Sequence, residues 1–252
     1  METQLQLDIL PQPDLTTCGP TCLQAVYRFF GDHVPLEQVV AEVPTLKTGG
    51  TLAVFLGCHA LSRGYRARIY TYNLQVFDPT WFDNHPKGEL QRRLALQLEH
   101  RHGNREQVAI KAFLRFLDLG GEVRFQDLTP AIIRRYLNRA IPILTGLSST
   151  YLYRSAREVG PEGKADDIRG DPSGHFVVLS GYDRQARNVS VADPLPNPVS
   201  NLQHYPVSID RVICSILLGI LTYDGNLLVI QPRRSRRSNR AGAGRQTPPV
   251  AG

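Results

Sequence analysis

The stretch "PDLTTCGPTCLQAVYRFF", residues 13–30, places Cys18 directly before a strong helical pattern. The two threonines ahead of it are typical N-cap residues, and Pro20 suits the first turn of a helix. Apolar residues then recur at helical spacing as far as Gly31, where we expect the helix to stop. The pattern therefore predicts a helix that begins at Cys18.

A cysteine at this position has three possible roles. The free N–H groups and the positive dipole end of a helix N-terminus stabilise a thiolate, which suits a nucleophile. Cysteine also packs as a small apolar residue, so a structural role is a real alternative. Zinc is the third, because Cys18 and Cys22 are spaced C-x3-C and Cys58 adjoins His59. Zinc sites use a second paired set of ligands, which the sequence lacks, so we expect no metal.

A nucleophilic cysteine needs a base, and His175 is the best placed of the seven histidines. It opens "HFVVLSGYD" (175–183), an apolar stretch typical of a strand, directly after "DPSG". A histidine at the mouth of a sheet is held by rigid backbone and still reaches the surface. His100 and His102, by contrast, belong to a stretch typical of an exposed helix end.

The base in turn needs an orienting group, and Asp193 is the candidate. The strands "HFVVLSGYD" and "NVSVAD" are joined by the short connection "RQAR", which predicts a hairpin. Pairing of Tyr182 with Asn188 would put Asp193 opposite Val177. Asp193 would then be a diagonal neighbour of His175, with Cα atoms roughly 7–8 Å apart. A slip of one residue would separate them, and Asp193 would then be only a turn residue.

Gln12 is the candidate oxyanion donor, six residues before Cys18 in "LPQPDLTTCGP". The prolines on either side make its segment extended and stiff. Its side-chain amide could act with the backbone N–H of Cys18 to hold a developing oxyanion. Taken alone, a glutamine in a loop is more often without function.

The rest of the chain reads as helices first and an antiparallel sheet second, which predicts an α+β fold. We find no internal repeat and no linker before residue 232, so we expect one domain over 1–232, with extra helices within about 75–128. The predicted helices are 35–43, 51–65, 89–101, 106–120, 129–140 and 208–221, and the predicted strands are 66–72, 141–147, 175–183, 188–193 and 226–231.

A long polar connection, residues 148–174, separates two of the predicted strands. Loops of this length are uncommon and often functional. We interpret it as a lid or substrate wall, with Tyr151, Tyr153 and Arg154 as candidate substrate-binding residues. A surface insertion without function is the alternative.

Composition narrows the class of protein. The 252 residues include no run of 18 apolar residues, no secretory signal pattern and only four cysteines. We therefore expect a cytoplasmic protein without a disulfide scaffold or stable membrane insertion. The net charge of +6 comes from 233–252, which holds six arginines and no acid and which we expect to be a disordered tail. The body is neutral, so nucleic-acid binding is unexpected except through that tail.

Taken together, Gln12, Cys18 in "TCGPTCL", His175 in "GHFVVLSGYD" and Asp193 in "VADP" resemble a papain-like cysteine peptidase. The bacteriocin-processing, double-glycine-leader peptidases (cysteine peptidase family thirty-nine) and their stand-alone relatives are similar. This resemblance implies a papain-like fold in which N-terminal helices pack on a C-terminal antiparallel sheet. It implies that Cys18 is the nucleophile, His175 the general base, Asp193 its orienter and Gln12 the oxyanion donor, with no cofactor.

Two features limit what the resemblance implies. Members that cleave leader peptides are usually fused to an exporter and an ATPase domain, so leader cleavage does not carry over. The phytochelatin synthases are also similar, and they pass the acyl group to an amine rather than to water. We expect a cysteine peptidase or amide hydrolase acting on a peptide or amide. An acyltransferase of phytochelatin-synthase type and a non-catalytic peptide-binding module remain alternatives.

Overall fold

A computed structural model of the chain describes residues 2–47, 49–83, 86, 88–160, 162–198, 200–222 and 225–233. The expected basic tail lies outside this range except for Arg233, and so does His85. None of the helices in the described ranges has both the length and the apolar character needed to cross a membrane.

The first half of the chain is mostly helical, and most of the strands lie in the second half. The helices are α1 (Cys18–Phe29), α2 (Leu36–Glu42), α3 (Ala53–Ser62), α4 (Glu89–His100), α5 (Asn104–Asp118), α6 (Pro130–Leu137), α7 (Ser149–Tyr153) and α8 (Ile209–Leu218), with 3-10 turns η1 (Pro79–Phe82) and η2 (Gly219–Thr222). The strands are β1 (Glu2–Gln4), β2 (Tyr65–Thr71), β3 (Glu122–Arg124), β4 (Ile143–Ser148), β5 (Glu158–Val159), β6 (Lys164–Ala165), β7 (Gly174–Asp183), β8 (Asn188–Ala192), β9 (His204–Ser208) and β10 (Asn226–Pro232).

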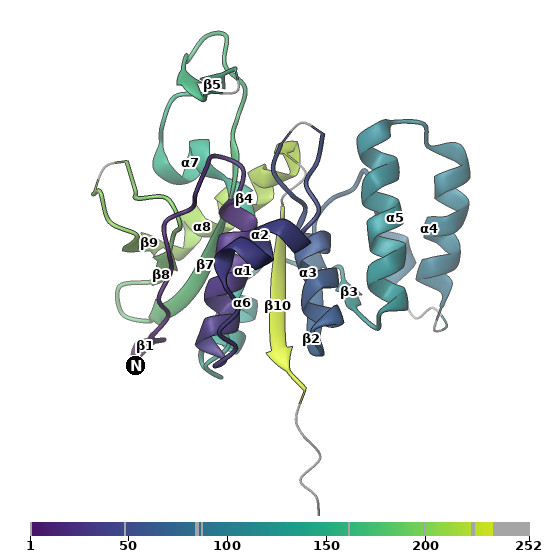
Figure 1. Cartoon of the computed structure of the whole chain (residues 1–252), viewed down its shortest axis with the longest axis horizontal. Coiled ribbons are helices and arrows are strands. Elements are labelled where there is room, and N and C mark those ends of the chain that lie inside the picture. The colour runs from purple at the N-terminus through teal and green to yellow at the C-terminus, as the bar shows by residue number, and fades with distance from the viewer. Residues whose placement is uncertain are drawn as a thin grey trace, which may run out of the picture.

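The strands form one large sheet in the order β3-β2-β10-β4-β7-β8-β9, with β1 paired to β7 (Figure 1). All pairs in it are antiparallel except β2 with β3. The last strand, β10, lies between β2 and β4, so the end of the described chain ties together strands from its first and second halves.

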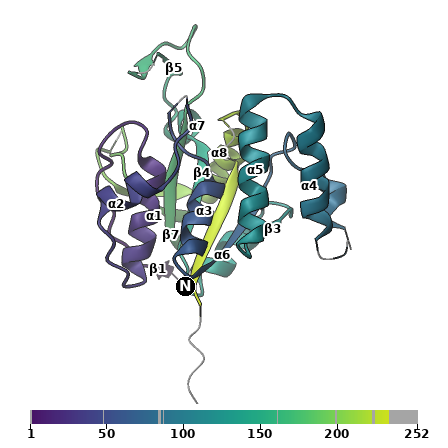
Figure 2. The same cartoon turned by 45° about the vertical axis from the view of Figure 1, so that its right-hand side comes forward.

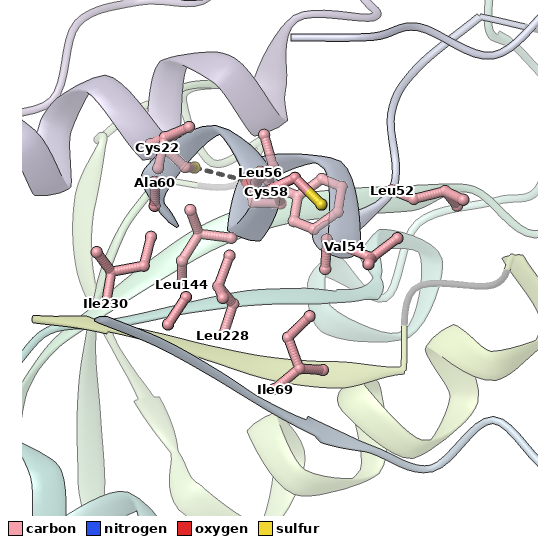
Figure 3. Close-up of a cluster of buried hydrophobic side chains, with 14 of the residues drawn as sticks. Cys22, Leu52, Val54, Leu56, Cys58, Ala60, Ile69, Leu144, Leu228 and Ile230 are labelled. Carbon is pink, nitrogen blue, oxygen red and sulfur yellow. Dashed lines mark hydrogen bonds between the residues drawn. The ribbon is translucent and has the colours of Figure 1, made fainter. Parts of the chain in front are cut away.

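Helices cover both faces of this sheet, which makes two apolar cores. On one face α1, α3 and α5 pack against alternate strand residues such as Ile69 and Val178 (Figures 1 and 3). On the other face α6, α7 and α8 pack against the intervening residues, such as Tyr70 and Val177 (Figure 2). Because both faces are buried, β7 is apolar almost throughout instead of alternating.

The predicted α+β class is confirmed, with the helices α1 to α3 packed on a mostly antiparallel sheet. The sequence prediction missed the short strands β1, β3, β5, β6 and β9 and the helix α7. Cys214 is exposed on α8, although it belongs to a largely apolar helix. The reason is that α8 turns only one side to the sheet, and Cys214 lies between the buried residues Val212 and Ile216.

The register of the β7–β8 hairpin differs from the prediction at one end only. Tyr182 pairs with Val189 rather than with Asn188. A bulge between Leu179 and Gly181 then shifts the pairing by one residue, so that Val178 lies opposite Ala192. Toward the start of β7 the register is therefore the predicted one. A Cβ on Gly181 would lie 2.6 Å from the carbonyl oxygen of Thr3, so the glycine lets β1 approach at the bulge.

Two segments stand apart from the central layers. Helices α4 and α5 pack against each other, and α5 also packs on α3, so the expected extra helices form an antiparallel pair beside the sheet (Figure 1). The polar connection 148–174 begins with α7 and continues into the small β5–β6 hairpin. It rises from the same end of the sheet as the start of α1 (Figure 1).

Candidate active site

Cys18 is the first residue of α1 and is 8% exposed. The loop before it is shaped by Asp14, whose Oδ1 accepts hydrogen bonds from the backbone N–H and the hydroxyl of Thr16, both at 2.7 Å. The N–H groups of the first helical turn have no acceptor within the helix. Gly19 packs so closely that a Cβ there would lie 2.5 Å from Cγ2 of Thr51. The sequence "TCGP" thus begins a helix beside a tightly packed neighbour.

His175 and Asp193 form a buried pair. Nε2 of His175 lies 2.8 Å from Oδ1 of Asp193, and their exposed fractions are 6% and 0%. His175 is the second residue of β7, and Asp193 directly follows β8. The bulge-corrected register brings these two positions to the same end of the hairpin. A hydrogen bond at Nε2 leaves Nδ1 for a partner on the other side of the ring.

Cys18 is the other group that acts electrostatically on His175. Burial by itself would lower the pKa of His175. The charge on Cys18 and hydrogen bonds with Asp193 and Cys18 outweigh burial and raise this pKa to about 10. An imidazolium beside the carboxylate of Asp193 is therefore favoured at neutral pH.

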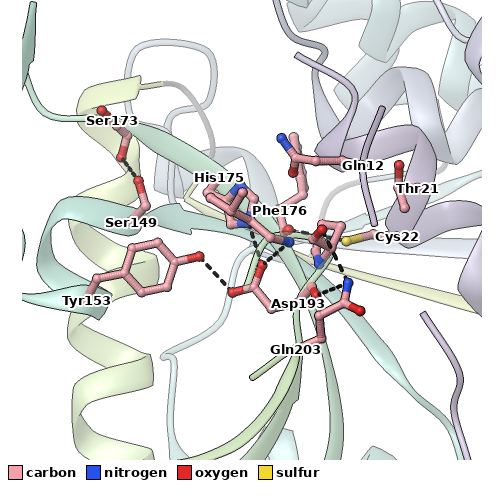
Figure 4. Close-up of polar contacts among 12 residues, drawn as sticks. Gln12, Thr21, Cys22, Ser149, Tyr153, Ser173, His175, Phe176, Asp193 and Gln203 are labelled. Atoms are coloured by element: carbon pink, nitrogen blue, oxygen red, sulfur yellow. Dashed lines mark hydrogen bonds and ion pairs between the residues drawn. The ribbon is translucent and has the colours of Figure 1, made fainter. Parts of the chain in front are cut away.

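Two tyrosines hold the far oxygen of Asp193. Oδ2 accepts the hydroxyls of Tyr153 at 2.7 Å and Tyr205 at 2.5 Å, while Oδ1 also accepts the N–H of Leu195 at 2.9 Å. Figure 4 shows Asp193 between His175 and Tyr153. Burial would raise the pKa of Asp193, but hydrogen bonds from His175 and the two tyrosines hold it below the usual value. The carboxylate therefore stays ionised in a fully buried position.

Gln12 lies at the edge of this group. Its backbone N–H donates to the carbonyl of Pro194 at 3.0 Å, which fixes the loop beside Asp193. Its side-chain Nε2 donates to the carbonyl of Asp14 at 2.7 Å. Oε1 is buried and has no hydrogen-bond partner among the described residues. The structure thus places the amide beside the site with one of its Nε2 hydrogens already used.

The three candidate substrate-binding residues lie in different environments. Tyr151 is 44% exposed on α7, and Arg154 follows that helix in an exposed left-handed conformation. Tyr153 is buried, and its hydroxyl is taken by Asp193, so it lies behind the carboxylate instead of on a substrate wall. The base of the connection is closed where Ser149 bonds to Ser173 (Figure 4).

Sequence reasoning missed Tyr205 altogether. It lies on β9, the edge strand beside β8. The five residues of β9 alternate between exposed and buried. That alternation is the signal for a half-buried strand, and it could have placed Tyr205 on the same face as Val207. No sequence feature connects it to Asp193, because the contact depends on the pairing of β8 with β9.

The other cysteines differ from Cys18. Cys22 is fully buried and donates to the carbonyl of Phe176 at 3.2 Å, and burial raises the pKa of its thiol well above normal. Burial likewise raises the pKa of Cys58 to about 11. Both therefore remain protonated at neutral pH. In the described residues no three His, Cys, Asp or Glu side chains are grouped as metal ligands would be.

Comparison with protein families gives one match. Residues 121–209 match the Peptidase_C39 like family. No curated protein matches the sequence.

Solved structures that are similar to this chain have low sequence identity. A double glycine motif protease from an AMS/PCAT transporter, in complex with the leader peptide, is 15% identical, covers 92% of this chain and 95% of its own, and has a TM-score of 0.44. The peptidase domain of Streptococcus ComA is 16% identical, with coverages of 90% and 100% and a TM-score of 0.42. Xylellain, a cysteine protease from Xylella fastidiosa, is 13% identical, with coverages of 92% and 86% and a TM-score of 0.43.

The matched segment carries His175 and Asp193, but Cys18 and Gln12 lie outside it. The resemblance seen in the sequence is therefore confirmed at the level of the family, over residues 121–209. The site and the family match are together those of a cysteine peptidase-like hydrolase.

Proposed function

We propose that this protein cleaves a peptide or amide bond through Cys18, His175 and Asp193. The observation that carries the proposal is the buried His175–Asp193 pair, with its second ring nitrogen available to a cysteine at a helix N-terminus. Each group has the environment that its role needs. The imidazole is flanked by a thiol and an ionised carboxylate, and the backbone N–H groups of a first helical turn lie beside the thiol.

In the first step the Cys18 thiolate attacks the carbonyl carbon of the scissile bond. A C–S bond forms, and the carbonyl electron pair moves onto oxygen. The N–H groups at the start of α1 stabilise this oxyanion. The imidazolium of His175 gives its proton to the leaving nitrogen, the C–N bond breaks, and the amine departs. A thioester on Cys18 and a neutral imidazole remain.

In the second step His175 acts as a base. It removes a proton from an acceptor that attacks the thioester carbonyl, and the Cys18 thiolate leaves. Asp193 keeps the ring oriented and stabilises the imidazolium that forms again. With water as the acceptor the product is a carboxylic acid, and with an amine it is a new amide. We propose water, and treat transfer to an amine as the alternative.

We propose Gln12 as a further oxyanion donor. Its backbone is tied beside the site by Pro194, and its side chain has one N–H that Asp14 does not use. The buried Oε1 without a partner is a costly arrangement. The unused N–H of Nε2 could donate to a developing oxyanion while the other N–H keeps its bond to the carbonyl of Asp14. The role would be confined to the transition state, where such donors are most effective.

The thiol chemistry also bears on where the protein acts. All four cysteines are unpaired. Free thiols persist in a reducing compartment. We therefore propose a cytoplasmic enzyme whose partner is its peptide or amide substrate.

The experiment that tests this function is the capture of an acyl-enzyme. The protein would be mixed with a small activated ester, and the thioester would be measured by intact mass and mapped to one cysteine. Wild type should acylate at Cys18, and Cys18→Ala should not acylate. Cys214→Ala, which removes the exposed cysteine, is the matched control and should behave as wild type. Acylation at Cys214 alone would contradict the proposal.

The fate of the thioester separates the two acceptors. Adding an amine such as glycine methyl ester during turnover of the ester reveals any new amide product. Release of the free acid at an unchanged rate supports hydrolysis. Amide formation in preference to acid would assign the protein to acyl transfer instead.

A further inference from the structure

A second surface, separate from the catalytic side chains, lies between the turn after α2 and the first half of α5. It is an open groove of about 500 Å³. Leu46 and Val108 supply its apolar part, and Lys47, Arg105 and Lys111 supply three cations. A volume of this size is within the range that binding sites occupy.

The charge of the groove has one sign. None of the described residues that line it is acidic. Lys47 and Lys111 form no ion pair with a described carboxylate. Glu106, on the same helix, lies beside Gly103 instead, where an added Cβ would be 3.3 Å from its Oε2. A concave surface lined by cations alone concentrates positive potential and favours an anionic partner.

The turn after α2 connects the groove to the loop that precedes the nucleophile. Two backbone hydrogen bonds of 2.9 Å hold Leu46 close to Gly49 and Gly50: the N–H of Leu46 donates to the carbonyl of Gly50, and the N–H of Gly49 donates to the carbonyl of Leu46. On the far side of this turn, a Cβ on Gly49 would lie 3.1 Å from Cγ2 of Thr16, two residues before Cys18. The same turn thus contacts the catalytic loop and forms a wall of the groove. Figure 1 shows the turn, the start of α1 and the start of α5 along one edge of the molecule.

We propose that this groove binds an acidic segment of the peptide substrate, on one side of the bond that Cys18 attacks. The proposal rests on the proposed hydrolase function and adds the substrate class. Carboxylates would meet Lys47 and Lys111, and apolar side chains between them would pack on Leu46 and Val108. The groove has no aromatic residue among its described lining on which a base could stack, which favours a peptide over a nucleic acid.

Binding is tested with the Cys18→Ala protein, so that no turnover interferes. The probe is a mixture of short fluorescent peptides in which Glu alternates with Leu or Val, compared with the same mixture carrying Gln in place of Glu. Exposed ion pairs are individually weak, so the acidic mixture should bind roughly tenfold more tightly at low salt. This preference should shrink as salt is added.

Two double variants locate the binding site. Lys47→Glu with Lys111→Glu should abolish the preference for the acidic mixture. Arg139→Glu with Arg184→Glu changes the net charge equally at two exposed residues far from the groove and should preserve it. Equal binding of both mixtures, or equal loss in both double variants, would overturn the proposal. Displacement of the probe by a single-stranded oligonucleotide that binds more tightly would also overturn it, in favour of a nucleic-acid site.

A separate measurement, the rate of acylation at Cys18, tests the catalytic proposal. In the background of an intact Cys18, the groove variant should be acylated by the small activated ester at the wild-type rate, because this ester does not reach the groove. Normal acylation with no acidic preference contradicts only the groove. An acidic preference without any acyl-enzyme in wild type leaves the groove standing and contradicts the hydrolase.

Discussion

Tyr205 donates its hydroxyl to Oδ2 of Asp193 at 2.5 Å, which leaves Oδ1 for His175. Tyr205 lies on β9, and Asp193 directly follows the neighbouring strand β8, at the end of the hairpin that carries the histidine. A fully buried carboxylate keeps its charge only when hydrogen bonds replace the lost water. The tyrosine therefore contributes to the charge of the group that orients the base.

This contact predicts that Tyr205→Phe slows acylation at neutral pH. A hydrogen bond to a charged group contributes about 1.5–3 kcal/mol. If the lost bond mainly stabilises the ionised form of the site that reacts, the acylation rate should fall about 10- to 150-fold. The rate of acylation by the activated ester, followed against pH, measures it. Tyr72→Phe is the control, since the buried hydroxyl of Tyr72 has no partner among the described residues. Equal rates in wild type and Tyr205→Phe would remove the positioning role.

A second prediction concerns pH. The pKa of His175 is raised to about 10 by Cys18 and Asp193, against the effect of burial. Because the folded value lies above the unfolded one, the contribution of His175 to the stability of the folded protein is complete below about pH 6.5. That contribution is lost as the pH rises through about 10. Over the same range His175 loses the proton that it gives to the leaving nitrogen, so we predict that kcat/KM falls near that pH.

Asp193→Asn tests whether Asp193 sets the pH of this alkaline fall in kcat/KM. Loss of the carboxylate removes two of the interactions that raise the pKa of His175. The alkaline limb should move down by about 1–3 pH units, and the maximum rate should fall. Asp210→Asn, at an exposed carboxylate paired with Arg187, is the matched control and should leave the profile in place. An unmoved limb in Asp193→Asn would show that His175 does not depend on Asp193.

A third prediction concerns packing beside the nucleophile. Gly19→Ala would drive a Cβ to 2.5 Å from Cγ2 of Thr51. Overpacking of this kind costs about 1–3 kcal/mol of unfolding free energy, measurable by urea denaturation. Thr51→Ser removes that methyl group and keeps the hydroxyl that donates to Pro44. The double variant should recover most of the loss, and no recovery would contradict the packing argument.

A fourth prediction concerns Gln12. Gln12→Ala should lower turnover by roughly 10²–10³ while substrate binding stays nearly unchanged, if the amide donates to the oxyanion. Gln24→Ala is the control, because this glutamine is buried on the same helix as Cys18 but bonds to the carbonyl of Val34. Wild-type rates in Gln12→Ala would leave Cys18 and His175 in place and remove the oxyanion role.

Local signals predicted the parts of the fold that local chemistry controls. The helix α1 (Cys18–Phe29) was predicted from the residues before it and from the helical spacing of its apolar residues. The strand at His175 was predicted from its run of apolar residues. The pairing of that strand was harder. The predicted register was wrong at Tyr182 and right beyond it, because a bulge at Ser180 shifts the hairpin by one residue. No sequence pattern shows that bulge, since Gly181 owes its place to the approach of β1.

The site shows the same division. Cys18, His175 and Asp193 were each predicted from residue type and local context, and the structure brings all three together. Tyr205 and the buried role of Tyr153 were not predicted, since both depend on elements that meet only in the folded chain. The position of β10 between β2 and β4 is likewise a property of the whole sheet.

The central claim is that His175 activates Cys18, and the alkylation rate of each cysteine tests it most directly. Iodoacetamide labelling at about pH 6, followed by peptide mapping, compares Cys18 with the exposed Cys214 in the same sample. Although Cys18 is 8% exposed, it should be labelled faster than Cys214 in wild type and more slowly in His175→Ala. Labelling of Cys214 first in wild type, or an unchanged Cys18 rate in His175→Ala, would contradict the account.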